Sequence, residues 1–282
     1  MIMIADSGST KTDWAFLHDD GRIVHFTSAG YNPNYVTGEY IYADIKQNVP
    51  TGINLDNINA VYFYGAGVTE LQYGFIEKTM RCVFPQCATV EVAMDTLGAA
   101  RALLGDDQGL VVILGTGMNS ALYDGRCITM NIDSLGFILG DEGSGGYMGK
   151  RLMIDYCRHN ITGRVYEMVK NEVGLNSDEV IDQIYTKPFP NRWCAKFAKF
   201  IGKHIDDDPY FAELVSSSFR NCFDKILTHY PSYQDYPINC VGSVAYYFRP
   251  MLEAVCHEYG MTIGRIMQYP IDGLVEYHKN HS

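Results

Sequence analysis

Two short segments, 3–17 and 111–123, arrange small residues in the same way. Each begins with an apolar run, continues through a small-residue turn and ends in a second apolar run. The first turn contains Gly8-Ser9-Thr10 and the second contains Gly115-Thr116-Gly117. Glycines and small hydroxyl residues between paired strands let backbone N–H groups converge on an anion without a Cβ atom in the way. The repeat therefore indicates a duplicated chain with a phosphate-binding turn in each half.

Other phosphate-binding motifs do not fit these turns. A dinucleotide-binding loop leads from a strand into a helix, whereas the residues after Gly117 read as a β-hairpin. A Walker-type loop needs Gly-Lys-Ser/Thr at the start of a helix, and Lys11 lies in a strand-turn-strand segment instead. Either turn alone could be an ordinary hairpin corner. Two turns that face each other would hold successive phosphates of one nucleotide, which predicts an ATP site.

Two aspartates follow apolar strands where a carboxylate could take part in phosphoryl transfer. Asp6 directly precedes the first turn, and because a bare carboxylate is repelled by a triphosphate, Mg²⁺ is expected between them. Asp95 follows the strand expected at 88–93 and could act as the general base for a hydroxyl nucleophile. The structural alternatives are a turn-initiating aspartate at position 6 and a helix N-cap at position 95.

Three further segments have the composition of ligand-contacting turns. Residues 140–146 combine acids, a serine and glycines, and their density of glycine exceeds the need of a helix cap, which indicates close approach to a ligand. Gly242-Ser243 separates a buried strand from a helix, so the glycine would allow approach to a flat group such as adenine or ribose. Asn34 could hydrogen-bond a substrate hydroxyl, although Asn32-Pro33-Asn34 is first of all a turn sequence.

The composition of the 282-residue chain argues against nucleic-acid and membrane partners. Its formal charge of −11 opposes phosphate-backbone binding, which relies on clustered Lys and Arg. No apolar stretch approaches the length of a membrane span, and Asp6 interrupts the apolar N-terminus, which argues against a secretory signal. The eight cysteines contain no CxxC pair, so neither a disulfide framework nor a zinc site is predicted. We therefore expect a cytoplasmic protein with reduced thiols.

The expected elements form two series, each typical of a mixed α/β sheet. The first has strands at 1–5, 12–18, 22–27, 59–64 and 88–93, and helices at 37–48, 69–82 and 96–104. The second has strands at 110–115, 118–124, 127–131, 237–241 and 262–267, and helices at 143–158, 162–174, 177–185, 191–205, 208–229 and 244–259. We place the boundary near 106–109. This gives an N-terminal domain 1–108 and a C-terminal domain 109–282 with a helical insertion, and a terminal helix near 270–280 could pack on the N-terminal domain.

The motifs together resemble a known family. The matching segments are 6–12, Gly65-Ala66-Gly67, Asp95, 115–119, 140–144 and Val241-Gly242-Ser243. This set is similar to the N-acetylglucosamine kinase branch of the BadF/BadG/BcrA/BcrD ATPase family, within the actin, sugar-kinase and Hsp70 superfamily. The resemblance implies two ribonuclease-H-like domains in an actin-like ATPase fold with an interdomain cleft. It also implies phosphoryl transfer from MgATP to a sugar hydroxyl, most simply the 6-OH of N-acetylglucosamine.

The resemblance carries residue roles with it. It implies that Asp6 positions Mg²⁺ and that Asp95 is the catalytic base. The nucleotide side comprises Gly8, Ser9, Thr10, Lys11, Thr12, Gly115, Thr116, Gly117, Gly242 and Ser243. The sugar side comprises Asn34, Gly67, Asp95, Gly136 and Asp141. The expected partner is a small-molecule sugar, and the sequence is compatible with a homodimer.

Two departures from the family pattern bear on which sugar is used. Gly65-Ala66-Gly67 replaces a Ser-Gly-Gly turn, and Leu135 stands where a tryptophan often precedes the glycine at Gly136. Two other functions are compatible with the same fold. One is an ATPase activator of a radical dehydratase, which needs cysteine ligands for an iron–sulfur cluster, and Cys82 and Cys87 are the nearest pair in sequence. The other is a non-catalytic sugar or nucleotide sensor, which needs no general base.

Overall fold

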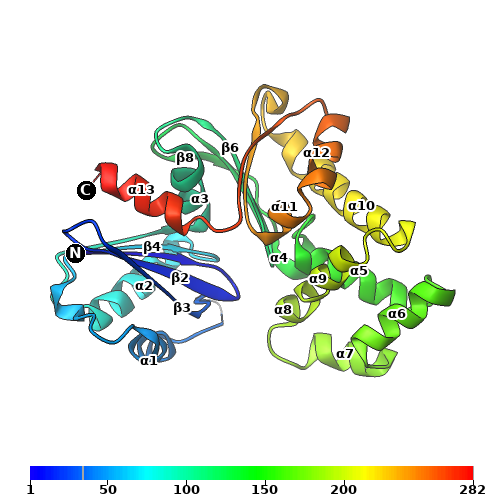
Figure 1. Ribbon diagram of the computed structural model, residues 1–282, viewed down its shortest axis with the longest axis horizontal. Coiled ribbons are helices and arrows are strands. Elements are labelled where there is room, and N and C mark those ends of the chain that lie inside the picture. Colours follow the sequence, from blue (N-terminus) through cyan, green and yellow to red (C-terminus); the bar gives the residue numbers. More distant parts are fainter. Residues whose placement is uncertain (34, 282) are drawn as a thin grey trace. The chain divides into compact units, whose positions relative to one another are not determined.

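The computed structural model describes residues 1–33 and 35–281, and the chain forms two compact units (Figure 1). Unit 1 contains the N-terminal segment Met1–Gly109, the hairpin tip Tyr123–Thr129 and the C-terminal segment from Tyr269. Unit 2 contains Leu110–Leu122 and Met130–Gln268. These units are defined by packing, so the division into ribonuclease-H-like domains 1–108 and 109–282 stays a prediction. Each unit is built on its own five-stranded sheet.

The sheet of unit 1 has the order β3-β2-β1-β4-β5. Its strands are β1 (Ile2–Ser7), β2 (Lys11–Leu17), β3 (Ile23–Ala29), β4 (Ala60–Gly65) and β5 (Thr89–Met94). The first three strands pair antiparallel through short turns, and β4 and β5 run parallel to β1. The parallel strands require helical crossovers, which the chain supplies between β3 and β4 and between β4 and β5.

Helices cover both faces of this sheet. They are α1 (Gly38–Asn48), α2 (Glu70–Val83), α3 (Asp95–Leu104) and α13 (Ile271–His281). Successive strand residues point to opposite faces: Trp14 packs with the α1 and α2 side, whereas Ala15 packs with the α3 and α13 side. In Figure 1, α13 (red) lies on the other side of the blue strands from α1. The C-terminal helix therefore completes the second core of unit 1.

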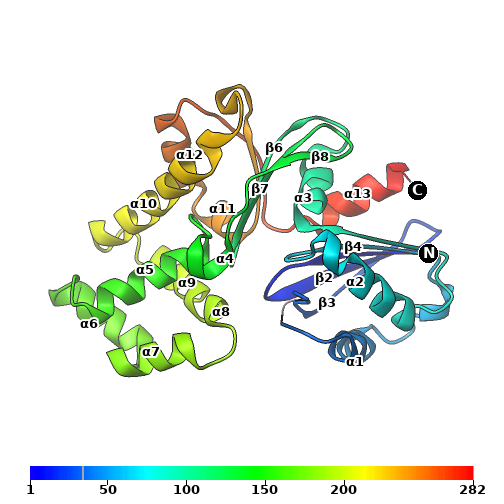
Figure 2. The same ribbon diagram turned by 180° about the vertical axis from the view of Figure 1, so that it is seen from behind.

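The sheet of unit 2 repeats the plan, with the order β10-β9-β6-β7-β8. Its strands are β6 (Gly109–Leu114), β7 (Met118–Tyr123), β8 (Ile128–Asn131), β9 (Ile238–Val241) and β10 (Ile263–Met267). Read from the opposite edge, this order matches that of unit 1 strand for strand, and β9 and β10 are again parallel additions to the first strand. The duplication inferred from two short motifs thus extends to the whole sheet, of which β6, β7 and β8 are labelled in Figure 2.

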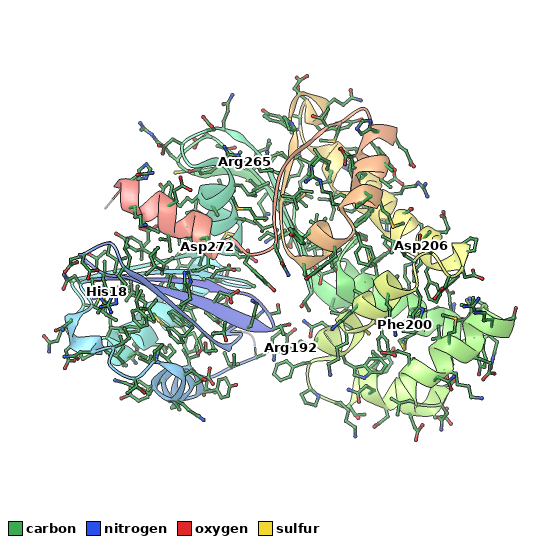
Figure 3. All side chains as sticks on the ribbon, viewed as in Figure 1. His18, Arg192, Phe200, Asp206, Arg265 and Asp272 are labelled. Atoms are coloured by element: carbon green, nitrogen blue, oxygen red, sulfur yellow. The ribbon has the colours of Figure 1, made fainter. Side chains whose placement is uncertain are left out.

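Nine helices follow in unit 2 within the described part of the chain. They are α4 (Gly136–Leu139), α5 (Gly145–Cys157), α6 (Gly163–Val173), α7 (Ser177–Tyr185), α8 (Pro190–Ala195), α9 (Phe197–Lys203), α10 (Pro209–Lys225), α11 (Ser243–Tyr247) and α12 (Arg249–Glu258). Phe200 lies among these helices, whereas Asp206 and Arg265 point outward (Figure 3). The apolar helix faces and the sheet enclose one continuous core.

Three of the expected helices were wrong in extent. The segment 244–259 is two helices, because Pro250 lies in the first turn of α12 and has no N–H to donate to a preceding turn. The segment 191–205 is divided at Lys196 into α8 and α9. The segment 208–229 ends as α-helix at Lys225 and continues as a 3₁₀ turn. Within residues 1–33 and 35–281, no helix combines the length and apolar character needed to cross a bilayer.

Buried His278 links α13 to the sheet of unit 1. Its ring stacks on Tyr62 with 3.8 Å between ring centroids, and its Nε2 lies 2.9 Å from the hydroxyl of Tyr64. Arg101 donates to the same hydroxyl at 2.6 Å. Burial, with the nearby Arg101 charge, lowers the pKa of His278 from 6.5 to about 3. The imidazole is therefore neutral in the folded protein over the physiological range.

We predict that His278 makes unit 1 sensitive to acid. Because the folded-state pKa lies below the unfolded value, the unfolded chain binds the extra proton. Stability is thus fully present above pH 6.5 and falls by about 1.4 kcal/mol per pH unit as the pH drops towards 3. Urea unfolding of the wild type and His278→Gln at several pH values should show a stability difference that shrinks below pH 6.5. A constant difference contradicts the prediction, and His257→Gln, at an exposed position of α12, is the control.

Candidate active site

Three parallel strands of unit 1 end at one edge of the sheet. Ser7 at the end of β1 is paired with Gly65 at the end of β4, and Gly65 is paired with Met94 at the end of β5. The predicted site residues of this half follow directly: the turn 8–10, Gly67 and Asp95. The carboxyl edge of parallel strands is the usual position for ligands in α/β folds. The structure therefore brings these segments of unit 1 to one edge of the sheet.

The first small-residue turn is fixed by its own backbone. Gly8 N–H donates to the carbonyl of Lys11 at 2.9 Å, which closes the turn. Gly30 N–H donates to the carbonyl of Thr10 at 3.2 Å, and a Cβ atom on Gly30 would lie 2.4 Å from the carbonyl oxygen of Gly8. Only glycine fits at this approach. Ser9 and Thr10 form the accessible apex of the turn.

A buried pair of hydroxyl groups joins the two strand ends that flank the turn. The hydroxyl of Ser7 lies 2.8 Å from that of Thr12 and accepts from the N–H of Tyr31 at 3.1 Å. Thr12 in turn donates to the carbonyl of Ala29 at 2.8 Å and is fully buried. Thr12 was expected on the nucleotide side. Its hydroxyl is engaged within the protein, so its contribution is to hold the turn in shape.

Lys11 lies beside the turn with its ammonium group held on two sides. Its Nζ is 2.8 Å from a carboxylate oxygen of Asp13 and 3.7 Å from the ring centroid of Tyr269. Its side chain is 43% exposed, so the charge stays accessible from outside. Both contacts lie within unit 1.

Asp6 carries an imperfectly compensated negative charge. Burial, followed by the charges of Asp13 and Asp95, raises its pKa from 3.8 to about 7, and Lys11 opposes this shift. Carboxylates whose ionised form is disfavoured by neighbouring acids are stabilised by a bound cation. The donor chemistry of this edge therefore fits a hard cation such as Mg²⁺.

A cation here would need ligands from outside the protein. Among residues 1–33 and 35–281, no three His, Cys, Asp or Glu side chains converge as a metal-binding group. Mg²⁺ typically uses one or two carboxylates and takes its remaining ligands from water and substrate phosphates. A single carboxylate at Asp6 is compatible with that mode.

Asp95 is the first residue of α3 and follows the end of β5. It is partly exposed, and its charge acts on Asp6. Gly67 is exposed with φ +71, and a Cβ on it would lie 2.7 Å from the side-chain amide of Asn32. Asn34, expected on the sugar side, lies outside the described residues. Asn32, which the sequence did not single out, belongs to the same Asn-Pro-Asn motif as Asn34.

The second turn, in unit 2, is built in the same way. Gly115 N–H donates to the carbonyl of Gly117 at 3.0 Å. The start of α5 docks on this turn, because Gly145 N–H donates to the carbonyl of Gly115 at 2.8 Å and Gly146 N–H donates to that of Thr116 at 2.9 Å. The two glycine turns are therefore equivalent in position, between the first two strands of their sheets. In each, the first glycine donates the closing hydrogen bond, to a residue three positions on in unit 1 and two positions on in unit 2.

The glycines of 140–146 have a structural explanation that the sequence did not give. A Cβ on Gly140 would lie 2.0 Å from the carbonyl oxygen of Ser134, and one on Gly146 would lie 2.8 Å from that of Thr116. The close approach expected from their density is thus to the protein's own backbone. A ligand is not needed to account for these glycines, which corrects the interpretation from sequence.

Gly242 brings a third segment to the second turn. Its N–H donates to the carbonyl of Met267 at 3.0 Å. Its φ is +119, and a Cβ would lie 2.2 Å from the carbonyl oxygen of Leu114. Ser243, the first residue of α11, is exposed next to it. The predicted nucleotide residues of unit 2 thus lie at one edge of its sheet.

Asp141 connects this turn to the predicted sugar side. It has φ +62 and is 6% exposed. Its Oδ1 accepts from the N–H of Met118 at 3.1 Å, and the carboxylate lies against Gly117. Burial raises its pKa to about 6, although the Met118 hydrogen bond and the Lys150 charge lower it. Gly136, with φ +66, begins α4 a few residues earlier.

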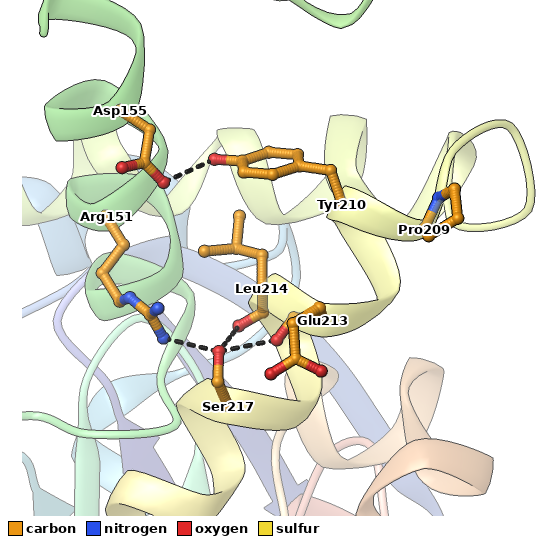
Figure 4. Close-up of a pocket in the computed structure, with 7 residues that line it drawn as sticks. All are labelled: Arg151, Asp155, Pro209, Tyr210, Glu213, Leu214 and Ser217. Atoms are coloured by element: carbon orange, nitrogen blue, oxygen red, sulfur yellow. Dashed lines mark hydrogen bonds between the residues drawn. The ribbon is translucent and has the colours of Figure 1, made fainter. Parts of the chain in front are cut away.

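A separate pocket of about 360 Å³ lies between α5 and α10 in unit 2 (Figure 4). Arg151 donates to the hydroxyl of Ser217 at 2.8 Å, and Tyr210 donates to Asp155 at 2.8 Å. None of the predicted site residues lines this pocket. The described candidate residues of each unit therefore lie away from this pocket, at the edge of that unit's own sheet.

Comparison with solved structures assigns the family. A protein from Porphyromonas gingivalis, provisionally named an N-acetylglucosamine kinase, is 40% identical over 100% of both chains, with a TM-score of 0.92. The chain belongs to this N-acetylglucosamine kinase-like branch of the BadF/BadG/BcrA/BcrD family. No family model matches the sequence, and no curated protein does.

More distant structures share the fold alone. A second provisionally named N-acetylglucosamine kinase, from Chromobacterium violaceum, is 15% identical over 98% of both chains, with a TM-score of 0.72. A ROK family glucokinase from Streptomyces griseus, solved with glucose and AMPPNP, is 13% identical over 99% of this chain and 98% of that chain, with a TM-score of 0.53. The family has the two-domain actin-like ATPase fold, as the sequence predicted.

We predict that Gly242→Ala destabilises unit 2, because the methyl group would collide with the Leu114 carbonyl and φ +119 is strained for alanine. A loss of about 3 kcal/mol in the free energy of unfolding is expected from urea denaturation. Gly115→Ala is the matched control, since no heavy atom lies within 4 Å of a Cβ there. Equal stability of the two variants would contradict the tight contact at Gly242.

Proposed function

We propose that the chain is an ATP-dependent sugar kinase that transfers the γ-phosphoryl group to a hydroxyl of an amino sugar, with the 6-OH of N-acetylglucosamine as acceptor. The observation that carries this proposal is the full-length 40% identity to the Porphyromonas gingivalis protein. The equivalent glycine turns of the two units and the aspartate at the end of β5 support it. The departures Gly65-Ala66-Gly67 and Leu135 make other amino sugars the main competing acceptors.

The nucleotide is proposed to bind through both turns. In unit 1, Ser9 and Thr10 would present backbone N–H groups and hydroxyls to phosphate, since turns of this kind form anion-binding concavities. Gly8, whose own N–H closes the turn, would let the phosphate approach the backbone without a Cβ atom in the way. Lys11 would add positive charge, and Thr12 would keep the turn in shape. The Streptomyces griseus glucokinase, of the same fold, was solved with AMPPNP, which supports ATP as the phosphoryl donor.

In unit 2, Thr116 and Gly117 are proposed to contact the phosphates, with Gly115 closing the turn. Gly242 and Ser243 are proposed to border the nucleoside. Asp6 is the proposed carboxylate for Mg²⁺. Burial and the charges of Asp13 and Asp95 raise the pKa of Asp6 more than Lys11 lowers it, and a bound cation would favour the ionised form. Mg²⁺, when bound, would supply positive charge that screens the triphosphate.

The sugar is proposed to contact Asn34, Gly67 and Asp95 in unit 1, and Gly136 and Asp141 in unit 2. Asp95 would accept the proton of the attacking hydroxyl as its oxygen forms a bond to the γ-phosphorus. The bond from that phosphorus to the bridging oxygen breaks, and ADP leaves with the electron pair. General base catalysis of this kind contributes about 10²–10⁴ in rate.

The two alternative functions are not favoured. Cys87 is buried and donates to the carbonyl of Thr89, whereas Cys82 is exposed, so this pair does not present thiols to one cluster. A sensor would not require an aspartate at position 95. We also propose that the protein acts in the cytoplasm, where ATP is available. A homodimeric assembly is part of the same proposal.

We predict sugar-dependent ADP release by the purified protein with MgATP. N-acetylglucosamine should give the highest kcat/KM among N-acetylglucosamine, glucosamine, N-acetylmannosamine, N-acetylmuramic acid and glucose. Asp95→Asn should keep the fold and nucleotide affinity and lose about 10²–10⁴ in kcat, because the proton acceptor is gone. Coupled spectrophotometry measures the rates and calorimetry the nucleotide affinity.

The control for this assay is Asp107→Asn, an exposed aspartate of unit 1 that should leave kcat unchanged. Near-normal kcat in Asp95→Asn would remove Asp95 from the base role. ADP release that no sugar stimulates, despite sugar binding, would favour the sensor instead.

We further predict proton release when MgADP binds. With a pKa of about 7, Asp6 is about half protonated at pH 7, and a nearby divalent cation favours the carboxylate. Up to about 0.5 proton per nucleotide should therefore be released at pH 7 and almost none at pH 8.5. Calorimetry in buffers of different ionisation enthalpy measures this number. The part due to Asp6 is the difference from Asp6→Asn, and a difference of zero at pH 7 argues against a metal at Asp6.

A further inference from the structure

Lys150 of α5 reaches the segment that carries both predicted sugar residues of unit 2. Its Nζ donates to the backbone carbonyl of Phe137, the second residue of α4. It also lies 5.0 Å from the ring centroid of Phe137 and 5.5 Å from that of Tyr147. Phe137 follows Gly136 directly. The lysine is thus hydrogen-bonded to α4 next to Gly136.

The segment 134–141 has an unusual backbone. Leu135, Gly136 and Asp141 all have φ between 58° and 66°. Left-handed conformations of non-glycine residues are unfavourable and persist only where the surroundings enforce them. Two backbone bonds close the segment: Gly140 N–H to the carbonyl of Gly136 at 2.8 Å, and Asp141 N–H to that of Ser134 at 3.0 Å. Further restraint from outside the segment is therefore expected.

Lys150 also provides the positive charge next to Asp141. The two side chains interact electrostatically, and the lysine lowers the pKa of the aspartate. The neighbouring acid, Glu142, has a different partner, since Lys225 donates to it at 3.1 Å. Lys150 therefore interacts with both acids, more strongly with Asp141, whereas Lys225 makes the direct contact with Glu142.

The helix that carries Lys150 is itself rigidly placed. Its first residues donate to the carbonyls of Gly115 and Thr116. Further along, a Cβ on Gly149 would lie 1.9 Å from the carbonyl oxygen of Cys194, so α5 is in backbone contact with α8. Lys150 is thus a side chain on a fixed helix that joins the second phosphate turn to the sugar segment.

We propose that Lys150 is a positioning residue for the sugar: its bond to the Phe137 carbonyl and its charge beside Asp141 hold the segment 134–141 in the conformation that presents Gly136 and Asp141. This proposal rests on the proposed sugar kinase function. No step of the reaction passes through the lysine. Its effect is on sugar affinity, because the loop would otherwise have to be ordered when sugar binds.

The test compares Lys150→Met, which keeps an unbranched apolar stem and removes the ammonium group, with Lys150→Arg, which keeps a donor and the charge. Lys150→Met should raise the KM for N-acetylglucosamine about tenfold or more, as expected for loss of a hydrogen bond from a charged donor. Its KM for ATP should stay within about twofold. Lys150→Arg should recover most of the sugar affinity. Equal increases in both KM values, or no recovery with arginine, would overturn the proposal.

Lys225→Met is the matched control, because it removes the cation beside Glu142 without touching α4. It should leave the sugar KM within about twofold of wild type, and an increase equal to that of Lys150→Met would overturn the specific role of Lys150. Hydrogen exchange, monitored by mass spectrometry, tests the restraint without catalysis. The amides of residues 135–141 should exchange about tenfold faster in Lys150→Met than in the wild type. Lys225→Met should not show this increase. Unchanged exchange overturns the proposal even if the protein phosphorylates no sugar.

Discussion

Backbone contacts that admit no side chain hold the small-residue turn of each unit. In unit 1, Gly30 lies against the carbonyl of Gly8, and in unit 2, Gly242 lies against that of Leu114. At such separations even a methyl group would displace the chain. The turns are therefore shaped by neighbouring backbone segments, and the N–H groups and hydroxyls at their apices need no ordering when an anion arrives. Preorganisation of this kind is what the proposed phosphoryl transfer would require of the two turns.

The sequence predicted what local patterns determine. The strand-turn-strand repeats, the two five-stranded sheets and the family follow from residues close together in the chain, and the structure and comparisons confirm them. Helix extents were less predictable, as Pro250 shows. The glycines of 140–146 were assigned to ligand contact because their true neighbours, such as Ser134 and Thr116, are set by folding of the whole segment.

Two residues next to the candidate site that the sequence did not single out share one property. Lys150 is a single lysine in an amphipathic helix, and Asn32 is half of a turn motif, so neither differs from ordinary surface or loop residues in sequence. What distinguishes them is the group that each contacts in the structure. Lys150 contacts the carbonyl of Phe137, and Asn32 lies against the backbone of Gly67. Contacts between residues that are separated in the sequence cannot be predicted from composition or periodicity.

The position of α13 has a consequence for biosynthesis. One face of the first sheet, with Ile4, Ala15 and Tyr64, is covered by Leu274 and Val275 of this helix. During translation nearly all of unit 2 emerges from the ribosome between these partners. Helix α3 can cover part of this face early, because it is synthesised before unit 2. The part that α13 covers stays an exposed apolar surface until late in synthesis, and assembly of the first unit finishes only after the second has had time to fold.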